Sequence, residues 1–244
     1  MKTRSLRLLM VVVAFIAVSA VFLNVSHVAQ KKRPPSTTLA MPITTTSIRG
    51  AVATTLAQPA ALTSSLMRLT AAPVAVPMTV AIPSIGVSSH VLAVGMTAAH
   101  AMYAPEGGPN SPNWADTFWY RGGSLPGASG TATIAGHIDD AFGRYAVFGH
   151  LSRLVPGNRI IIHYPRSGLT VTFEVTATHA YTLAQSTTLP VLDLIYGYGP
   201  PHGRGPTPAK DGRAHLSLVT CAGSWDPRLS THSQRLVVSA VRIS

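Results

Sequence analysis

The chain has 244 residues, enough for one large domain or two small ones. Charged residues make up 11% of it, less than half the ~25% typical of soluble domains. Its 20 Gly and 19 Pro residues argue against a coiled coil or helical bundle, because both residue types break helices. The single Cys excludes an internal disulfide framework and a Cys-rich zinc module.

The positive charge is unevenly distributed along the chain. The net charge is +11, but residues 1–75 hold eight Lys and Arg and no acid, so the net charge of the remainder is only +3. A nucleic-acid binder more commonly concentrates positive charge on its folded domain, and we expect no nucleic-acid partner.

The N-terminus carries a membrane signal. Three basic residues in the first seven positions precede Leu8–Val28, 21 mostly apolar residues without a charge. As a helix this run would be about 31 Å long, which matches a hydrocarbon core of ~30 Å. We therefore expect residues 1–28 to be a signal anchor in the cell membrane, with the rest of the chain outside the cytoplasm. The small-residue pattern Val18-Ser19-Ala20 leaves a cleaved signal peptide open, and that alternative also exports the chain.

Residues 29–75 have the composition of a linker. They are rich in Thr, Ala, Ser and Pro and contain no acid and no aromatic residue. Such a segment buries too little apolar surface to offset the entropy of ordering it, so we expect a flexible linker. Within it, Ser47–Thr70 has helical spacing and is compatible with a short surface helix.

From about Val76 the sequence changes to short runs with the character of β-strands, separated by Gly- and Pro-rich turns. The clearest run, Thr170–Thr178, alternates apolar and polar residues, and Pro165–Gly168 joins it to the preceding run as a hairpin. About seven short strands of this kind predict one all-β barrel or sandwich over residues 76–244. The predicted strands are Met78–Ile82, Ser89–Val94, Thr131–Ala135, Arg159–Tyr164, Thr170–Thr178, His215–Thr220 and Leu236–Ile243.

Cys221 is the candidate nucleophile, because it is the only thiol and it ends a predicted strand before Ala222 and Gly223. A small buried hydrophobic residue is the alternative reading of a lone Cys. A nucleophilic thiol needs a base or a cation nearby, and among ten His residues His137 stands out as its candidate partner, because it directly follows a strand and Gly136. Arg235 begins the last strand and is a candidate for steadying an oxyanion.

Three segments together resemble the sortases, the cysteine transpeptidases that attach proteins to the wall of Gram-positive bacteria. Ser217-Leu218-Val219-Thr220-Cys221 is similar to the family's Cys strand, with Ser in place of its first Thr. Ala135-Gly136-His137-Ile138-Asp139 resembles its His segment, and Arg235-Leu236-Val237-Val238 resembles its Arg strand. The order also agrees, because Cys221 follows His137 by 84 residues and Arg235 follows Cys221 by 14. The His and Cys segments look most like the class F branch.

The resemblance implies an eight-stranded sortase-type β-barrel with short helices, and it implies a reaction. Cys221 is expected to attack the Thr–Gly bond of an LPXTG-like sorting signal, His137 to protonate the leaving amine, and Arg235 to hold substrate and stabilise the oxyanion. An amine on peptidoglycan or a pilin, or else water, then resolves the thioester. No cofactor and no metal are expected in this reaction.

The sequence departs from the class F pattern at two places. Ser233-Gln234-Arg235-Leu236 is closer to other sortase classes, so Arg242 and Arg228 are alternative cations. The Gly- and Pro-rich loop Tyr196–Arg213 is longer than the usual connection, and in the family this loop lies beside the substrate groove.

Two other functions stay open at this point. One is a wall-associated peptide-binding or scaffolding barrel without turnover, which would not need Cys221. The other is a zinc or calcium hydrolase built on His137, Asp139 and Asp140, three residues whose spacing is a weak metal-binding signal.

Overall fold

A computed structural model describes residues 72–97, 101–197 and 206–244. Across these ranges, no helix combines the length and apolar character needed to cross a membrane. The predicted anchor Leu8–Val28 and the predicted helix Ser47–Thr70 lie outside the described residues. The described residues all belong to one compact unit, Gln58–Ser244.

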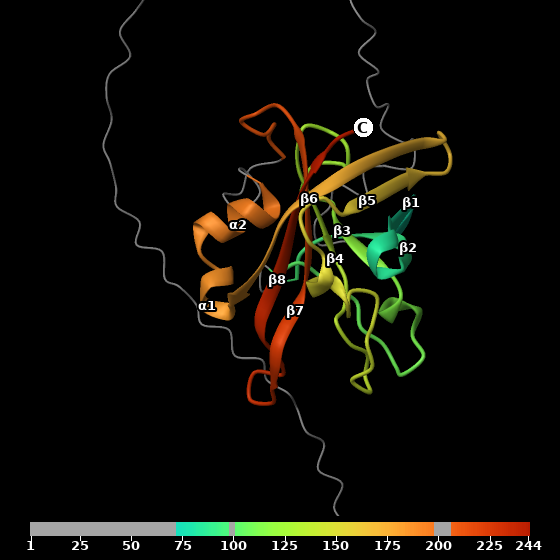
Figure 1. The fold of residues 1–244 in the computed structure, drawn as a ribbon. Helices are drawn as coiled ribbons and strands as arrows, with labels where there is room; N and C mark the ends of the chain where they lie inside the picture. Colours follow the sequence, from blue (N-terminus) through green and yellow to red (C-terminus); the bar gives the residue numbers. More distant parts are fainter. Residues whose placement is uncertain (1–71, 98–100, 198–205) are drawn as a thin grey trace, which may run out of the picture. The chain divides into compact units, whose positions relative to one another are not determined.

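The described chain forms eight β-strands, and short helical segments connect some of them (Figure 1). The strands are β1 (Val74–Ile82), β2 (Val87–Val94), β3 (Thr117–Tyr120), β4 (Gly130–Ala135), β5 (Arg159–Tyr164), β6 (Leu169–Thr182), β7 (Ala214–Asp226) and β8 (Thr231–Arg242). Two α-helices, α1 (Leu183–Ser186) and α2 (Leu189–Tyr196), follow β6. Single 3₁₀ turns are η1 (Pro83–Ile85), η2 (Pro112–Trp114) and η3 (Leu151–Arg153).

The strands close into a barrel in the order β1-β2-β3-β4-β7-β8-β6-β5. Most neighbours are antiparallel, but β2 with β3 and β4 with β7 run parallel. The interior is apolar: Ile134, Phe173, Leu218 and Val238 are fully buried, and each comes from a different strand. Removing a side chain of this kind costs about 2–5 kcal/mol in the free energy of unfolding, so the barrel is a firm scaffold for residues at its strand ends.

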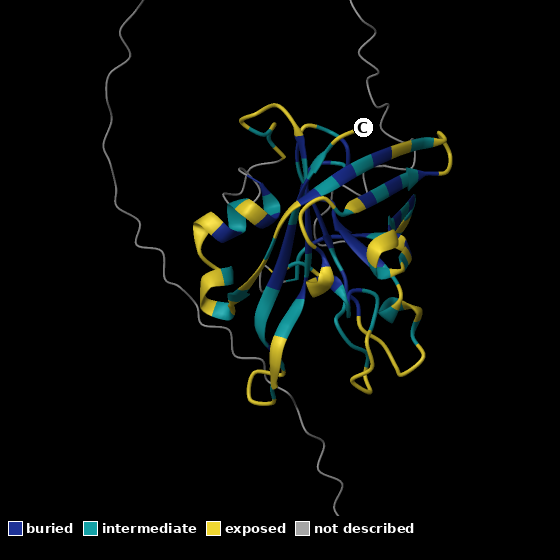
Figure 2. Cartoon of the chain, viewed as in Figure 1, coloured by how far each residue is buried: buried dark blue, intermediate teal, exposed yellow. Residues whose placement is uncertain are grey.

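The predicted all-β fold is confirmed, and each predicted strand corresponds to an observed one. The predicted hairpin is β5–β6, in which Ile162 pairs with Val171. Along β6, Val171, Phe173 and Val175 are buried while the residues between them are not, as the alternation predicted, and Figure 2 shows the resulting bands. β6, β7 and β8 are longer than predicted, because their added ends carry no regular alternation of apolar and polar residues.

The sequence prediction missed one strand and two helices. β3 is only four residues long and all four are buried, so it shows no alternation of apolar and polar residues. Helix α2 lies against the outside of β4 and β7. Its last turn accepts hydrogen bonds at carbonyl oxygens from the buried hydroxyls of Thr133, at 2.7 Å, and Ser217, also at 2.7 Å. Ser217, which stands where the sortase pattern has Thr, thus fixes the helix to the strand that carries Cys221.

Candidate active site

Cys221 lies near the end of β7 where the β7–β8 hairpin leaves the barrel. It pairs directly with Arg235 of β8 across the antiparallel ladder. Just beyond Cys221 the ladder contains a β-bulge, between Ala222 and Trp225, where β7 has one residue more than β8. Gly223 supplies the left-handed backbone that such a bulge needs, with φ of 76°. The bulge bends the tip of the hairpin next to the thiol.

The thiol of Cys221 is mostly buried, and burial is the largest influence on it, raising its pKa above the ordinary value. The positive charge of Arg235 and a hydrogen bond with Thr231 act in the opposite direction and lower the pKa. The carboxylates of Asp139 and Glu106 raise it further. With the net shift upward, the resting form at neutral pH is the protonated thiol.

The parallel pairing of β4 with β7 brings His137 next to the Cys221 segment. Ala135 pairs with Val219, and His137 and Cys221 each come two residues later. Beyond that pair the two chains stay joined, because the Gly136 amide donates to the Val219 carbonyl at 3.1 Å and Thr220 Oγ1 donates to the Gly136 carbonyl at 2.8 Å. The predicted His and Cys segments therefore leave the barrel side by side, from neighbouring strands.

The ring of His137 is held by aromatic neighbours and by one hydrogen bond. Trp114 and Phe118 contact it edge-on, with ring centroids 4.8 and 5.4 Å away. Its Nε2 lies 2.9 Å from the carbonyl oxygen of Pro105. Because a carbonyl oxygen only accepts, Nε2 carries a hydrogen, and the lone pair of the neutral ring is on Nδ1. This bond and the two aromatic contacts fix the orientation of the ring before substrate arrives.

The guanidinium of Arg235 is bound to its own hairpin. Nη1 donates to the carbonyl oxygens of His232 at 3.1 Å and Gln234 at 2.9 Å. Nη2 donates to Oγ1 of Thr231 at 2.9 Å. An arginine has five N–H groups, so Nε and one hydrogen of Nη2 are left for a substrate once the bonds to the described residues are made. These hydrogen bonds hold the Arg235 guanidinium in place before a substrate binds.

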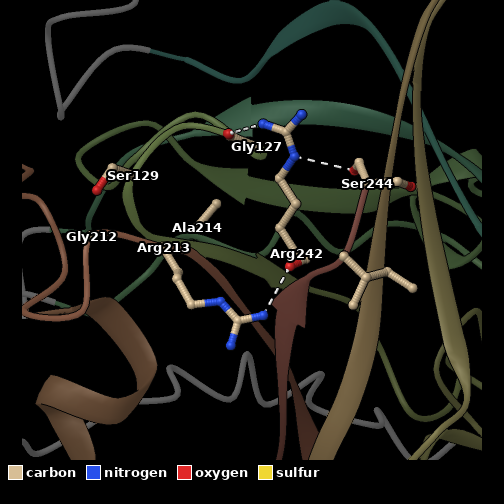
Figure 3. Close-up of a pocket in the computed structure, with 8 residues that line it drawn as sticks. Gly127, Ser129, Gly212, Arg213, Ala214, Arg242 and Ser244 are labelled. Carbon is tan, nitrogen blue, oxygen red and sulfur yellow. Dashed lines mark hydrogen bonds between the residues drawn. The ribbon is translucent and has the colours of Figure 1, made fainter.

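The alternative cations lie elsewhere. Arg228 is exposed in the turn after β7, where its amide bonds to Asp226. Arg242 is at the opposite end of β8 and lines an open pocket of about 470 Å³ with Arg213 (Figure 3). There its Nη1 donates to the Gly127 carbonyl at 2.9 Å and its Nε to the Ser244 carbonyl at 3.1 Å. Of the three arginines, Arg235 is the one paired with Cys221.

Asp139 and Asp140 have different partners, although they are neighbours in sequence. Asp139 lies 3.3 Å from Nε2 of His232, whose side chain is buried. Asp140 accepts a hydrogen bond from Nε of Arg144 at 2.7 Å and bonds to backbone amides of its own loop. Within the ranges that the structure describes, no three His, Cys, Asp or Glu side chains are grouped as they would be around a metal ion.

The predicted substrate-groove loop, Tyr196–Arg213, is described only at its two ends. Gly197 lies against Thr131, and the carbonyl of Arg213 accepts from the Gly130 amide at 3.1 Å. Both contacts are at the start of β4, at the end of the barrel away from Cys221. Residues 198–205 lie outside the described ranges.

Several neighbours of the site were not predicted from the sequence. Thr231 and His232 contact the guanidinium of Arg235, while Pro105 and Glu106 come from the connection between β2 and β3. Strand alternation counted back from Arg235 puts Thr231 on the same face, and that signal was available. No such sequence pattern identifies Pro105 or Glu106, because their positions beside the site depend on the path of the loop between β2 and β3.

Comparison with solved structures finds sortases. Sortase A from Corynebacterium diphtheriae, a lid mutant, is 20% identical with a TM-score of 0.47, over 73% of this chain and 75% of that one. Sortase C-1 from Actinomyces oris is 19% identical with a TM-score of 0.45, over 68% and 73%. A sortase D5 transpeptidase from Clostridium perfringens is 17% identical with a TM-score of 0.44, over 68% and 78%. No match was found among curated proteins. The family model described as Sortase domain matches residues 80–243, about two thirds of the sequence, and the chain therefore belongs to the sortase family of cysteine transpeptidases.

Proposed function

We propose that the protein is a membrane-tethered extracellular sortase of the class F type that cleaves an LPXTG-like sorting signal between Thr and Gly. Cys221 is the nucleophile, His137 the proton donor, and Arg235 the cation for substrate and oxyanion. The observation that carries this proposal is the direct pairing of Cys221 with Arg235 beside the segment that bears His137.

The acylation step uses the three side chains in different roles. The Cys221 thiolate attacks the carbonyl carbon of the Thr residue, and the carbonyl oxygen becomes an oxyanion. The free Nε–H and Nη2–H of Arg235 are suited to receive that charge, because their positions are already fixed. The C–N bond then breaks, and the departing amine of Gly takes a proton from the His137 imidazolium. The product is a thioester on Cys221 and a released amine.

The second step resolves the thioester. A primary amine on peptidoglycan or a pilin attacks the thioester carbonyl and gives up a proton to neutral His137. The C–S bond breaks and the Cys221 thiolate is regenerated. Water in place of the amine gives hydrolysis. Because Nε2 already donates to Pro105, the proton that moves in both steps is the one on Nδ1 of His137.

The proposed mechanism needs the thiolate and the imidazolium together. A thiol of ordinary pKa, ~8.5, is only about 3% ionised at pH 7. Burial raises the pKa of Cys221 and makes this share smaller still. The active form is therefore a minor fraction, because a thiol ionises as the pH rises whereas an imidazolium loses its proton. We expect a bell-shaped dependence of the rate on pH.

Peptide cleavage tests the proposal against its two alternatives. The purified full-length protein is incubated with LPXTG-containing peptides and a small primary amine, and products are identified by mass. Cleavage between Thr and Gly with transfer to the amine, lost on thiol blocking and insensitive to chelators, is the expected result. Peptide binding without cleavage would favour a binding or scaffolding barrel, and loss of cleavage with a chelator would favour a metal hydrolase.

The tether has its own test. Because Leu8–Val28 is long enough to span a membrane, the mature protein is expected to keep it and to sediment with membranes. Secreted protein whose N-terminus is Val21 would show instead that this segment is a cleaved signal peptide.

A further inference from the structure

A contact between Asp139 and His232 joins the segment that bears His137 to the β7–β8 hairpin, and the proposed mechanism does not use it. Nε2 of His232 lies 3.3 Å from Oδ2 of Asp139. A carboxylate oxygen only accepts, so Nε2 presents its hydrogen to Asp139. His232 is buried, with 8% of its surface exposed, and the contact is therefore partly shielded from water.

The Asp139 side of this contact leads to His137 through paired backbone. Asp139 comes two residues after His137 in the sequence. The amide of Phe148 donates to the His137 carbonyl at 2.9 Å, and Asp139 forms a β-bridge with Tyr145. Both ends of this short segment are thus paired with the returning chain, so a displacement of Asp139 is transmitted to His137.

The His232 side of the contact leads to Arg235. The His232 carbonyl accepts a hydrogen bond from Nη1 of Arg235 at 3.1 Å. His232 pairs with Trp225 across the ladder, and their rings meet edge-on with centroids 5.4 Å apart. The bulge between Ala222 and Trp225 interrupts the ladder between this pair and Cys221. Strand pairing alone therefore does not fix His232 relative to the thiol, and a side-chain contact to the His137 segment adds that constraint.

We infer that Asp139 and His232 are positioning residues, which hold the His137 segment and the Arg235 guanidinium at a fixed separation beside Cys221. This inference rests on the proposed roles of His137 and Arg235. The contact acts through the backbone on both sides: from Asp139 to His137, and from the His232 carbonyl to Arg235. A proton donor and an oxyanion cation that come from different segments are thereby kept in register for the same substrate bond.

The charge of Asp139 gives a way to separate positioning from ionisation. The Asp139 carboxylate raises the pKa of the Cys221 thiol. Its removal therefore favours the thiolate, and this effect alone would speed cleavage. A fall in the cleavage rate of Asp139→Ala comes instead from lost positioning.

A double-mutant cycle tests the pair in the full-length protein. Asp139→Ala, His232→Ala and the double variant break the contact, whereas His232→Gln keeps an N–H donor close to the place of Nε2. Asp211 and His215 provide the matched control, since Nε2 of His215 lies 3.0 Å from Oδ2 of Asp211 near the start of β7, away from Cys221. Thermal unfolding checks that each variant is folded. If His232→Ala does not fold, His232→Asn, whose amide is too short to reach Asp139, takes its place.

Each single variant is expected to lose roughly ten- to a hundredfold in peptide cleavage, mainly in kcat, the scale of a misplacement of up to about 1 Å. The double variant is expected to lose no more than the worse single variant, because one contact is broken in all three. His232→Gln recovers most of the rate, and Asp211→Ala and His215→Ala stay close to the wild type. Losses that multiply in the double variant, or a His232→Gln protein as slow as His232→Ala, would overturn the inference.

A second measurement needs no peptide. Iodoacetate is an anion and iodoacetamide is neutral, so the ratio of their alkylation rates reports the field of Arg235 at the chain's single thiol. At about pH 8.5, where ordinary imidazoles are neutral, the ratio is expected to fall several-fold in His232→Ala and to recover in His232→Gln. An unchanged ratio in His232→Ala would contradict the inference. A wild-type protein that cleaves no LPXTG peptide would defeat the proposed function and leave this comparison as it was.

Discussion

Two arginines of β8, Arg235 and Arg242, lie seven residues apart and have much in common, although Arg235 is near the start of the strand and Arg242 is its last residue. Each guanidinium donates to two backbone carbonyl oxygens. The strand that carries both arginines has buried residues, Leu236–Val238, between them. Their partners across the ladder differ: Arg235 faces Cys221 on β7, whereas Arg242 pairs with Phe173 on β6. Hydrogen bonding to the backbone therefore does not by itself distinguish the proposed catalytic arginine from a structural one.

The difference lies in what each guanidinium has beside it. Arg235 also bonds to the hydroxyl of Thr231 and exerts its charge on the thiol of Cys221. Arg242 bonds to Gly127 and Ser244, and so ties a loop and the last residues of the chain to the barrel. Under the proposed mechanism, the same type of side chain therefore serves chemistry beside Cys221 and architecture at the far end of β8.

The largest expected effect is at the thiol itself. Cys221→Ala is expected to abolish peptide cleavage, because no other thiol exists in the chain. Since the substitution removes only one sulfur atom near a strand end, the variant should remain folded. Cleavage assays with thermal unfolding as the control provide the measurement, and full activity in a folded variant would end the sortase mechanism proposed here.

The next effect separates the two arginines. Arg235→Lys keeps the charge, but an ammonium does not reproduce the planar set of donors, so the cleavage rate is expected to fall by roughly 10²–10³-fold. Arg242→Lys changes the same residue type at the other end of β8 and is expected to leave the rate within a few-fold of the wild type. A large loss of cleavage rate in Arg242→Lys together with a normal rate in Arg235→Lys would show that Arg242, not Arg235, is the catalytic cation.

A smaller effect concerns the ionisation of the thiol. Burial raises the pKa of Cys221, and the charge of Arg235 partly opposes that rise. Wild-type alkylation is therefore expected to be slow at pH 7 and to increase only near pH 8 and above. Arg235→Gln removes the opposing charge and should move the midpoint upward by about one unit, while Arg242→Gln should not move it. Alkylation that is fast and flat from pH 5 to 9 would contradict this picture.

Much of the barrel was predictable from the sequence, because half-buried strands leave an alternating pattern. The bands of Val171, Phe173 and Val175 are the clearest case. β3 was not predictable, since four consecutive buried residues carry no period. The ends of β7 and β8 beyond the barrel were also missed, because a hairpin that leaves the core needs no apolar face.

The candidate site was predictable in its residues but not in its geometry. The family resemblance supplied His137, Cys221 and Arg235, yet Arg242 and Arg228 stayed open because a motif does not give strand register. The ladder pairs Cys221 with Arg235, and this pairing is the reason for proposing Arg235 as the cation. The bulge between Ala222 and Trp225, next to Cys221, was also not predictable, because no periodic pattern encodes it.

The most direct test of the central claim is the mass of the protein after mixing with a sorting peptide. The full-length protein is incubated with an LPXTG-containing peptide without added amine, quenched in acid, and digested for mass mapping. The account predicts an adduct equal in mass to the peptide portion ending at Thr, attached to Cys221 and removed by hydroxylamine. Peptide cleavage in which no such adduct ever forms on Cys221, or an adduct on another residue, would contradict it.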